Sequence, residues 1–188
     1  HDREAYTTKI AAVGPAAPGT PAPTWTAFLD RITGDDEELQ GYLRRFVGYS
    51  LTGETSEHVF AFGHGLGANG KSVFVTTLQR IVGDYAVTVP TEVLMEANTD
   101  RHPTELARLR GARLAVGSET EQGRRWAESR IKALTGGDTV AARFMRQDFF
   151  EFAPQFKLFV VGNHRPSLRG VDEAIRRRLH LVPFSVTI

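Results

Sequence analysis

GLGANGKS, residues 65–72, is the stretch of this chain that decides its fold. It fits the phosphate-binding pattern G-x-x-x-x-G-K-[ST], in which glycines let the backbone curl so that its amide groups face a phosphate. Residues 58–63 (HVFAFG) are predicted to form a short buried strand before it, and residues 71–82 follow with apolar side chains at helical spacing. This order predicts a nucleoside triphosphate site, with the positive end of the helix directed at the phosphates. The alternative is a glycine-rich surface loop.

Two side chains at the end of this loop have specific roles in the nucleotide-binding interpretation. Lys71 reaches the β and γ phosphates, and the Ser72 hydroxyl binds Mg²⁺, which neutralises charge as the terminal phosphoryl group leaves. We therefore expect ATP and Mg²⁺ at this site. The predicted nucleotide-binding residues are Gly65, Gly67, Ala68, Asn69, Gly70, Lys71, Ser72 and Val73.

Composition narrows the class of protein. The chain has 188 residues, 41% of them hydrophobic, which suits one domain with a sizeable core and a small appendage. The absence of cysteine excludes disulfides, cysteine metal sites and thiol nucleophiles. The sequence also lacks the run of about 20 apolar residues that would span a membrane. We expect a cytoplasmic protein with no membrane partner.

The charge is distributed unevenly along the chain. The formal net charge is +1, but residues 1–100 hold 7 basic and 13 acidic side chains, whereas residues 101–188 hold 16 basic and 9 acidic ones. A basic half is typical of a surface that binds a polyanion such as a nucleic acid. Alternatively, these arginines lie on solvated helix faces or contact other subunits.

The N-terminal region is expected to lie outside the nucleotide-binding core. Residues 11–23 are rich in Ala, Pro and Gly, a composition typical of a linker. The chain begins without Met, so we expect it to be cut from a longer protein. Two predicted amphipathic helices form a small helical bundle. The predicted divisions are a tail at 1–23, a helical subdomain at 24–55 (helices 24–32 and 35–51) and a core at 56–188.

Strands and helices alternate after the phosphate loop, which predicts an α/β fold with a mainly parallel sheet covered on both faces. The predicted helices are 104–110, 124–134 and 172–177, and the predicted strands are 112–118, 156–162 and 179–184, with two further short strands around Met145.

Hydrolysis also needs polar groups at the ends of neighbouring strands, to hold the metal shell and orient water. Glu119 follows one apolar strand and is the predicted catalytic and metal-binding carboxylate, with Glu121 as a helper. Asn163 follows another and is placed to contact the γ phosphate and water. The alternatives are a solvent-facing loop glutamate and an asparagine that caps a turn.

Two groups of basic residues in the second half of the chain are further candidates. Arg176, Arg177 and Arg178 end a short predicted helix, and at least one is a candidate arginine finger, acting on a neighbouring molecule. The others are solvated or face DNA. Residues 141–147 place two cations and two large apolar groups around a hairpin tip, which suits contact with a nucleic-acid strand. We predict that the nearby Phe149, Phe150 and Phe152 belong to the core.

Five blocks in this order resemble the superfamily 3 helicases, in particular the helicase domain of phage, plasmid and poxvirus-type primase-helicases. The blocks are GLGANGKS, LRGARLAVGSETEQG, IKALTGGDTVAARF, FFEFAPQFKLFVVGNHRP and VDEAIRRRLHLVPF. The resemblance implies an AAA+-like core in a homo-hexameric ring that unwinds DNA from 3′ to 5′. It also implies single-stranded or forked DNA as partner, an upstream primase-type module, and a phage or plasmid gene in a bacterial host.

The resemblance also implies residue roles. Lys71 and Ser72 match the Walker A pair, Glu119 the Walker B acid and Asn163 the sensor-1 residue; Ser118 stands where many members carry a second acid. Arg177 and Arg178 match an arginine pair that supplies a finger in trans. The element expected to line the ring channel and bind DNA comprises Lys132, Arg143, Phe144, Met145 and Arg146.

Two other classes of function remain open. A small-molecule or nucleoside kinase also uses a phosphate loop, with an acceptor pocket and a lid that the sequence does not reveal. A nucleotide-switched DNA-binding scaffold would bind ATP with negligible turnover. ATP hydrolysis that DNA stimulates separates a helicase motor from both.

Overall fold

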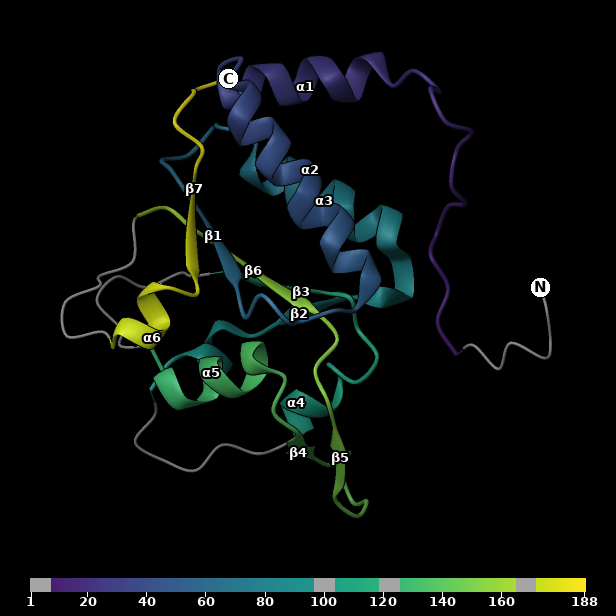
Figure 1. Ribbon diagram of the computed structural model, residues 1–188, viewed down its shortest axis with the longest axis vertical. Helices are drawn as coiled ribbons and strands as arrows, with labels where there is room; N and C mark the ends of the chain where they lie inside the picture. Colours follow the sequence, from purple (N-terminus) through teal and green to yellow (C-terminus); the bar gives the residue numbers. More distant parts are fainter. Residues whose placement is uncertain (1–7, 97–103, 119–125, 165–171) are drawn as a thin grey trace.

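A parallel sheet of five strands is the centre of the molecule (Figure 1). The computed structural model describes residues 8–96, 104–118, 126–164 and 172–188. The strand order is β2-β3-β6-β1-β7, so β1, which leads into the phosphate loop, has neighbours on both sides. The strands are β1 (Phe60–His64), β2 (Ala86–Val89), β3 (Leu114–Ser118), β6 (Lys157–Gly162) and β7 (Leu179–Pro183).

Helices cover both faces of this sheet. In Figure 1, α1, α2 and α3 lie above the sheet, and α4 and α5 lie below it, with the β4–β5 hairpin projecting at the bottom. The short 3₁₀ turns η2 (Gly83–Tyr85) and η3 (Thr91–Leu94) flank β2. The remaining elements are α1 (Pro23–Thr33), α2 (Glu37–Thr52), α3 (Lys71–Val82), α4 (Thr104–Ala107), α5 (Glu128–Gly136), α6 (Glu173–Arg176), β4 (Val140–Ala142) and β5 (Phe150–Phe152).

Side chains of the central strands alternate between two apolar cores, because successive residues of a strand point to opposite faces. From β1, Phe60 and Phe62 enter the core on the α5 side, whereas Ala61 enters the core on the α3 side. The α3-side core also contains Ile32 from α1 and Leu43 from α2. The two N-terminal helices therefore pack on the central sheet and share its core.

The ends of these N-terminal helices follow from local sequence. The Asp36 carboxylate accepts a hydrogen bond from the backbone N–H of Leu39 (2.9 Å) and caps α2, whose first turn is acidic, as the helix dipole favours. Gly34 and Gly53 end α1 and α2 in the left-handed conformation, with φ of 65° and 78°.

The α/β class, the parallel sheet and the bounds of α3 agree with the sequence predictions, while several other bounds differ. The strand predicted from residue 58 begins at Phe60, because His58 adopts φ 52°. The helix predicted over 104–110 ends at Ala107, and the one predicted over 124–134 runs from Glu128 to Gly136 in the part that is described. β2 was not predicted.

None of the helices in the described parts of the chain has the length and apolar character that a membrane span requires.

Candidate nucleotide site and nucleic-acid interface

The phosphate loop lies at the carboxyl-terminal edge of the sheet, where all five parallel strands end. It follows β1, whose last residue, His64, is paired with Gly162 of β6, so Asn163 comes directly beside the start of the loop. On the other side of β6, Ser118 at the end of β3 is opposite Val161. Glu119 follows Ser118 but lies outside the described residues. The edge thus brings together the loop and the predicted sensor.

Glycine is required at two positions of the loop. Gly65 has φ 151°, and a Cβ there would lie 2.0 Å from the carbonyl oxygen of Phe184. Gly70 has φ 79°, and a Cβ there would lie 2.4 Å from Cγ2 of Ile32 in α1. At Gly67, no atom of the described residues lies within 4 Å of the corresponding position. The loop is therefore packed against its neighbours at both ends and open in the middle, as a phosphate cradle requires.

Lys71 is buried at the start of α3, with 7% of its surface exposed. Its Nζ donates to the carbonyl oxygens of Gly65 and Leu66 and to Oδ1 of Asn69. Burial lowers the pKa of Lys71, because removal from water disfavours the ammonium form. The amine thus lies inside the loop, bonded to neutral oxygens, and a phosphate would supply the negative charge that favours its protonated form.

Asn69 links this lysine to the end of the sheet. Its Nδ2 donates to the carbonyl oxygens of Leu66 and of Phe184, the latter at 2.9 Å, while its Oδ1 accepts from Lys71. The segment after β7 also bonds to the loop, because the N–H of Ile188 donates to the carbonyl oxygen of Ala68 at 2.7 Å. Asn69 therefore fixes the loop and its lysine against the C-terminal residues.

The start of α3 fits an anion. Its N-cap, Gly70, has no side chain that could cap the helix, although Oδ1 of Asn69 accepts a hydrogen bond from the N–H of Lys71 (3.4 Å), and the first-turn residues Ser72 and Val73 are exposed. The described residues contain no group of three or more His, Asp or Glu side chains that could hold a metal.

The arginine turn, residues 176–178, lies at the opposite, amino-terminal edge of the sheet, where the parallel strands begin. The carbonyl oxygen of Arg178 accepts a hydrogen bond from the N–H of Phe60 (2.8 Å), the first residue of β1. Because β1 has five residues and a strand rises about 3.3 Å per residue, the turn lies roughly 15 Å from the loop of its own chain. The structure does not bring Arg177 or Arg178 to Lys71.

The two matched arginines differ in their surroundings. Arg177 is exposed. Arg178 is half-buried, and its Nη1 donates to the carbonyl oxygen of Ala174 (3.1 Å). Its Nε is buried with no hydrogen-bond partner among the described residues. Arg178 is thus packed into its own chain, whereas Arg177 is available to another molecule.

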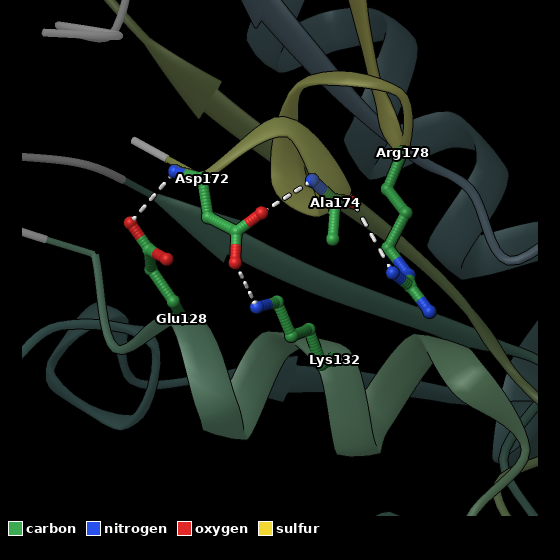
Figure 2. Close-up of polar contacts among 5 residues, drawn as sticks. All are labelled: Glu128, Lys132, Asp172, Ala174 and Arg178. Atoms are coloured by element: carbon green, nitrogen blue, oxygen red, sulfur yellow. Dashed lines mark hydrogen bonds and ion pairs between the residues drawn. The ribbon is translucent and has the colours of Figure 1, made fainter. Parts of the chain in front are cut away.

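Lys132 points toward α6, which precedes the arginine turn (Figure 2). Its Nζ lies 2.6 Å from Oδ2 of Asp172 in an ion pair. Asp172 was not among the predicted site residues, because it lies 40 residues from Lys132 and only the fold brings the two together.

The predicted hairpin is formed by β4 and β5, with Val140 opposite Phe152 and Ala142 opposite Phe150. At its tip, Met145 is 70% exposed and Phe144 is 40% exposed. Arg146 is also exposed and adopts φ 61°, as the tight turn demands.

Aromatic rings and guanidinium groups alternate along this hairpin. Phe144 stacks on Phe150 with centroids 5.4 Å apart, and the Arg110 guanidinium lies 5.0 Å from the centroid of Phe150. The Arg143 guanidinium lies 4.9 Å from the centroid of Phe149. Sequence reasoning missed Arg110 as part of this surface, although its segment is visibly rich in arginine.

The prediction that Phe149 belongs to the core is wrong, because this side chain is 62% exposed. Phe152 is buried and Phe150 is half-buried, so the burial of the aromatic rings decreases toward the tip. The tip thus presents exposed rings beside cations, a combination that suits unpaired bases and phosphates.

Comparison with known families and proteins places these features in context. A family described as "Family of unknown function (DUF5906)" matches residues 63–178. "Putative helicase L207/L206" of Acanthamoeba polyphaga mimivirus is 31% identical over 159 residues, 84% of this chain and 16% of that protein. "Putative helicase 022R" of Frog virus 3 is 32% identical over 162 residues, 81% of this chain and 16% of that protein. The chain thus spans about a sixth of these relatives.

Solved structures with the same fold include the apo C-terminal region of NrS-1, with TM-score 0.68, 13% identity, and coverage of 90% of this chain and 39% of that one. JCV helicase matches with TM-score 0.55, 14% identity, and coverage of 89% and 46%. These likenesses confirm the predicted AAA+-like α/β fold class. They concern the fold alone.

Proposed function

The chain belongs to the DUF5906 family, and on that premise we propose that it is an ATP-driven DNA helicase motor domain of the superfamily 3 type. The observation that carries this proposal is the phosphate loop, which holds a buried lysine at the start of α3, where the N-cap is a glycine, beside Asn163. Relatives named as helicases support the assignment to a motor.

ATP hydrolysis is the proposed reaction. Lys71 binds the β and γ phosphates, and the start of α3 adds its positive end. Ser72 and Glu119 hold Mg²⁺, which when bound offsets the negative charge that develops on the phosphate oxygens. Asn163 orients the attacking water from the neighbouring strand.

The site is completed by a neighbouring copy of the chain. The roughly 15 Å between the arginine turn and the loop of the same chain prevents an arginine from acting there, whereas a ring brings the turn of one subunit to the loop of the next. We assign the finger to Arg177, since Arg178 is held within its own chain. A homo-hexamer is the proposed assembly.

Single-stranded or forked DNA is the proposed track. Arg143 and Arg146 contact phosphates, and the exposed rings of Phe144 and Phe149 stack on bases that are not paired. We also propose that a primase-type module lies upstream of this domain.

The test is ATP hydrolysis by the purified chain over a range of protein concentrations, with and without single-stranded DNA. Lys71→Ala is the blank, and Arg80→Ala is the control, because Arg80 is an exposed cation on the same helix. We expect turnover per chain that rises with DNA and steeply with protein concentration. Turnover indifferent to both would favour a kinase, and ATP binding without turnover would favour a nucleotide-switched scaffold.

A further inference from the structure

Two side chains of α5 hold the start of α6 (Figure 2). Glu128 and Lys132 are four residues apart, so they lie on one face of the helix, one above the other. Oε1 of Glu128 accepts a hydrogen bond from the backbone N–H of Asp172 (3.3 Å), and Nζ of Lys132 pairs with Oδ2 of the same residue (2.6 Å). Asp172 is therefore bonded to α5 through both its backbone and its side chain.

Asp172 is also the N-cap of α6. Its Oδ1 accepts a hydrogen bond from the N–H of Ala174 (2.7 Å), so one carboxylate is shared between α5 and the first turn of α6. The hydrogen bond from Lys132 is the largest of the effects that hold the pKa of Asp172 below its ordinary value. The carboxylate is therefore charged, and both of its oxygens are engaged, at neutral pH.

The helix that these contacts hold has only four residues, too few for a stable helix on its own. Its orientation depends on its anchors. They are Asp172 at the start, Ile175 buried in the α5-side core, and Arg178, whose carbonyl oxygen accepts a hydrogen bond from the N–H of Phe60 in β1. Arg177 lies between the last two anchors and is exposed.

We infer that Lys132 is a positioning residue for the arginine turn, acting through Asp172, and is not a DNA ligand. The inference rests on the proposed function for the role of Arg177. An ammonium group 2.6 Å from a carboxylate is already neutralised by its partner, which weakens its attraction for a phosphate. Its contact instead fixes the helix from which Arg177 extends toward the next subunit.

The experiment compares Lys132→Met, Asp172→Asn and the double variant with Arg146→Gln at the hairpin tip. We expect Lys132→Met and Asp172→Asn each to lower kcat about 5- to 10-fold, with KM for ATP unchanged. This is the size of effect that loss of an ion pair or cap contact gives. The double variant should be no worse than either single one. DNA affinity and its dependence on salt should change only in Arg146→Gln.

A second measurement does not require turnover. Amide hydrogen exchange of residues 174–177 should be about 5- to 10-fold faster in Lys132→Met, while exchange in α3 stays as in the wild type. Unchanged exchange at residues 174–177 would overturn the inference, as would a Lys132→Met variant with weakened DNA binding and normal DNA-free ATP hydrolysis. Faster exchange combined with normal hydrolysis by Arg177→Ala would support the positioning role of Lys132 and refute the proposed finger. Failure of the inference and failure of the proposed function are therefore distinguishable.

Discussion

The two edges of the parallel sheet each carry a buried lysine, and their surroundings differ in kind. At the edge where β1 ends, Lys71 lies in a loop of backbone oxygens that is open to a ligand. At the edge where β6 begins, Lys157 is 2% exposed, and its Nζ donates to the carbonyl oxygen of Glu54 and lies 3.9 Å from the ring centroid of Tyr49. Burial lowers the pKa of both amines.

The difference supports the proposal that the edge with Lys71 is the one that binds nucleotide. Lys157 has an aromatic ring and a carbonyl that fill its surroundings, so it is part of the structure. Lys71 has only loop oxygens, and the loop beside it is open at Gly67. The arginine turn lies at the Lys157 edge, so under the proposed function each chain carries the two halves of the hydrolytic site on opposite edges. The proposal therefore requires a neighbouring copy of the chain to complete each site.

The largest expected effect tests this separation directly. Arg177→Ala should lower ATP hydrolysis by roughly 10³-fold or more, because an arginine finger stabilises charge on the transferred phosphoryl group. Mixing Arg177→Ala with Lys71→Ala should restore part of the activity, since some interfaces then pair an intact loop with an intact arginine. Absence of rescue at every mixing ratio would contradict action in trans.

At the other edge, Lys71→Ala should lower hydrolysis by about 10²- to 10³-fold, since it removes a donor that stabilises charge on the phosphates. Nucleotide binding, followed with a fluorescent ATP analogue, should weaken in parallel. Lys157→Met should leave nucleotide binding as in the wild type, because Lys157 is at the far edge. A Lys157→Met variant that loses nucleotide affinity would show that the two edges are not independent.

The phosphate loop could be predicted from sequence because its determinants are local. Eight consecutive residues specify the glycine conformations, the lysine and the start of α3, and no distant contact is needed to recognise them. The contacts of the arginine turn could not be predicted, because Lys132 meets Asp172 only through the fold. One signal was present: Glu128 and Lys132 have the four-residue spacing of side chains on one helix face.

Two predictions from the sequence failed for the same reason, one at the hairpin and one in the sheet. Phe149 was assigned to the core from its residue type, but β4 and β5 have three residues each and project beyond the layers that could cover it. β2 was missed because AVTV has only four residues, of which Val89 alone is buried, and it is a strand through its pairing with β3. Residue type predicts burial only where the fold supplies a second layer.

The hairpin tip should show an intermediate effect that separates bases from phosphates. Phe149→Leu should weaken binding of a single-stranded oligonucleotide about 5-fold or more, and should leave binding of an abasic oligonucleotide of equal length unchanged, because only bases stack on the ring. Arg146→Gln should weaken binding of both and lower the salt dependence by about one counterion. Equal losses for both oligonucleotides in Phe149→Leu would rule out base stacking.

The smallest effect concerns the structural lysine. Burial lowers the pKa of Lys157 to about 8, despite the opposing charges of Glu54 and Glu57, whereas the unfolded chain keeps the ordinary value of 10.5. Between these two pH values the unfolded state binds more protons than the folded state, so the free energy of unfolding rises with pH. The rise should be on the order of 1 kcal/mol once solvent screening is allowed for.

The measurement is the difference in unfolding free energy between the wild type and Lys157→Met, obtained from urea titrations between pH 7 and 11. Taking the difference cancels the titration of tyrosines and other lysines common to both proteins. The wild type should gain relative to the variant from pH 8 upward and stop gaining above about pH 10.5. A difference that stays flat over this range would mean that Lys157 keeps its ordinary pKa, and hence that the ring of Tyr49 and the Glu54 carbonyl solvate its charge as well as water does.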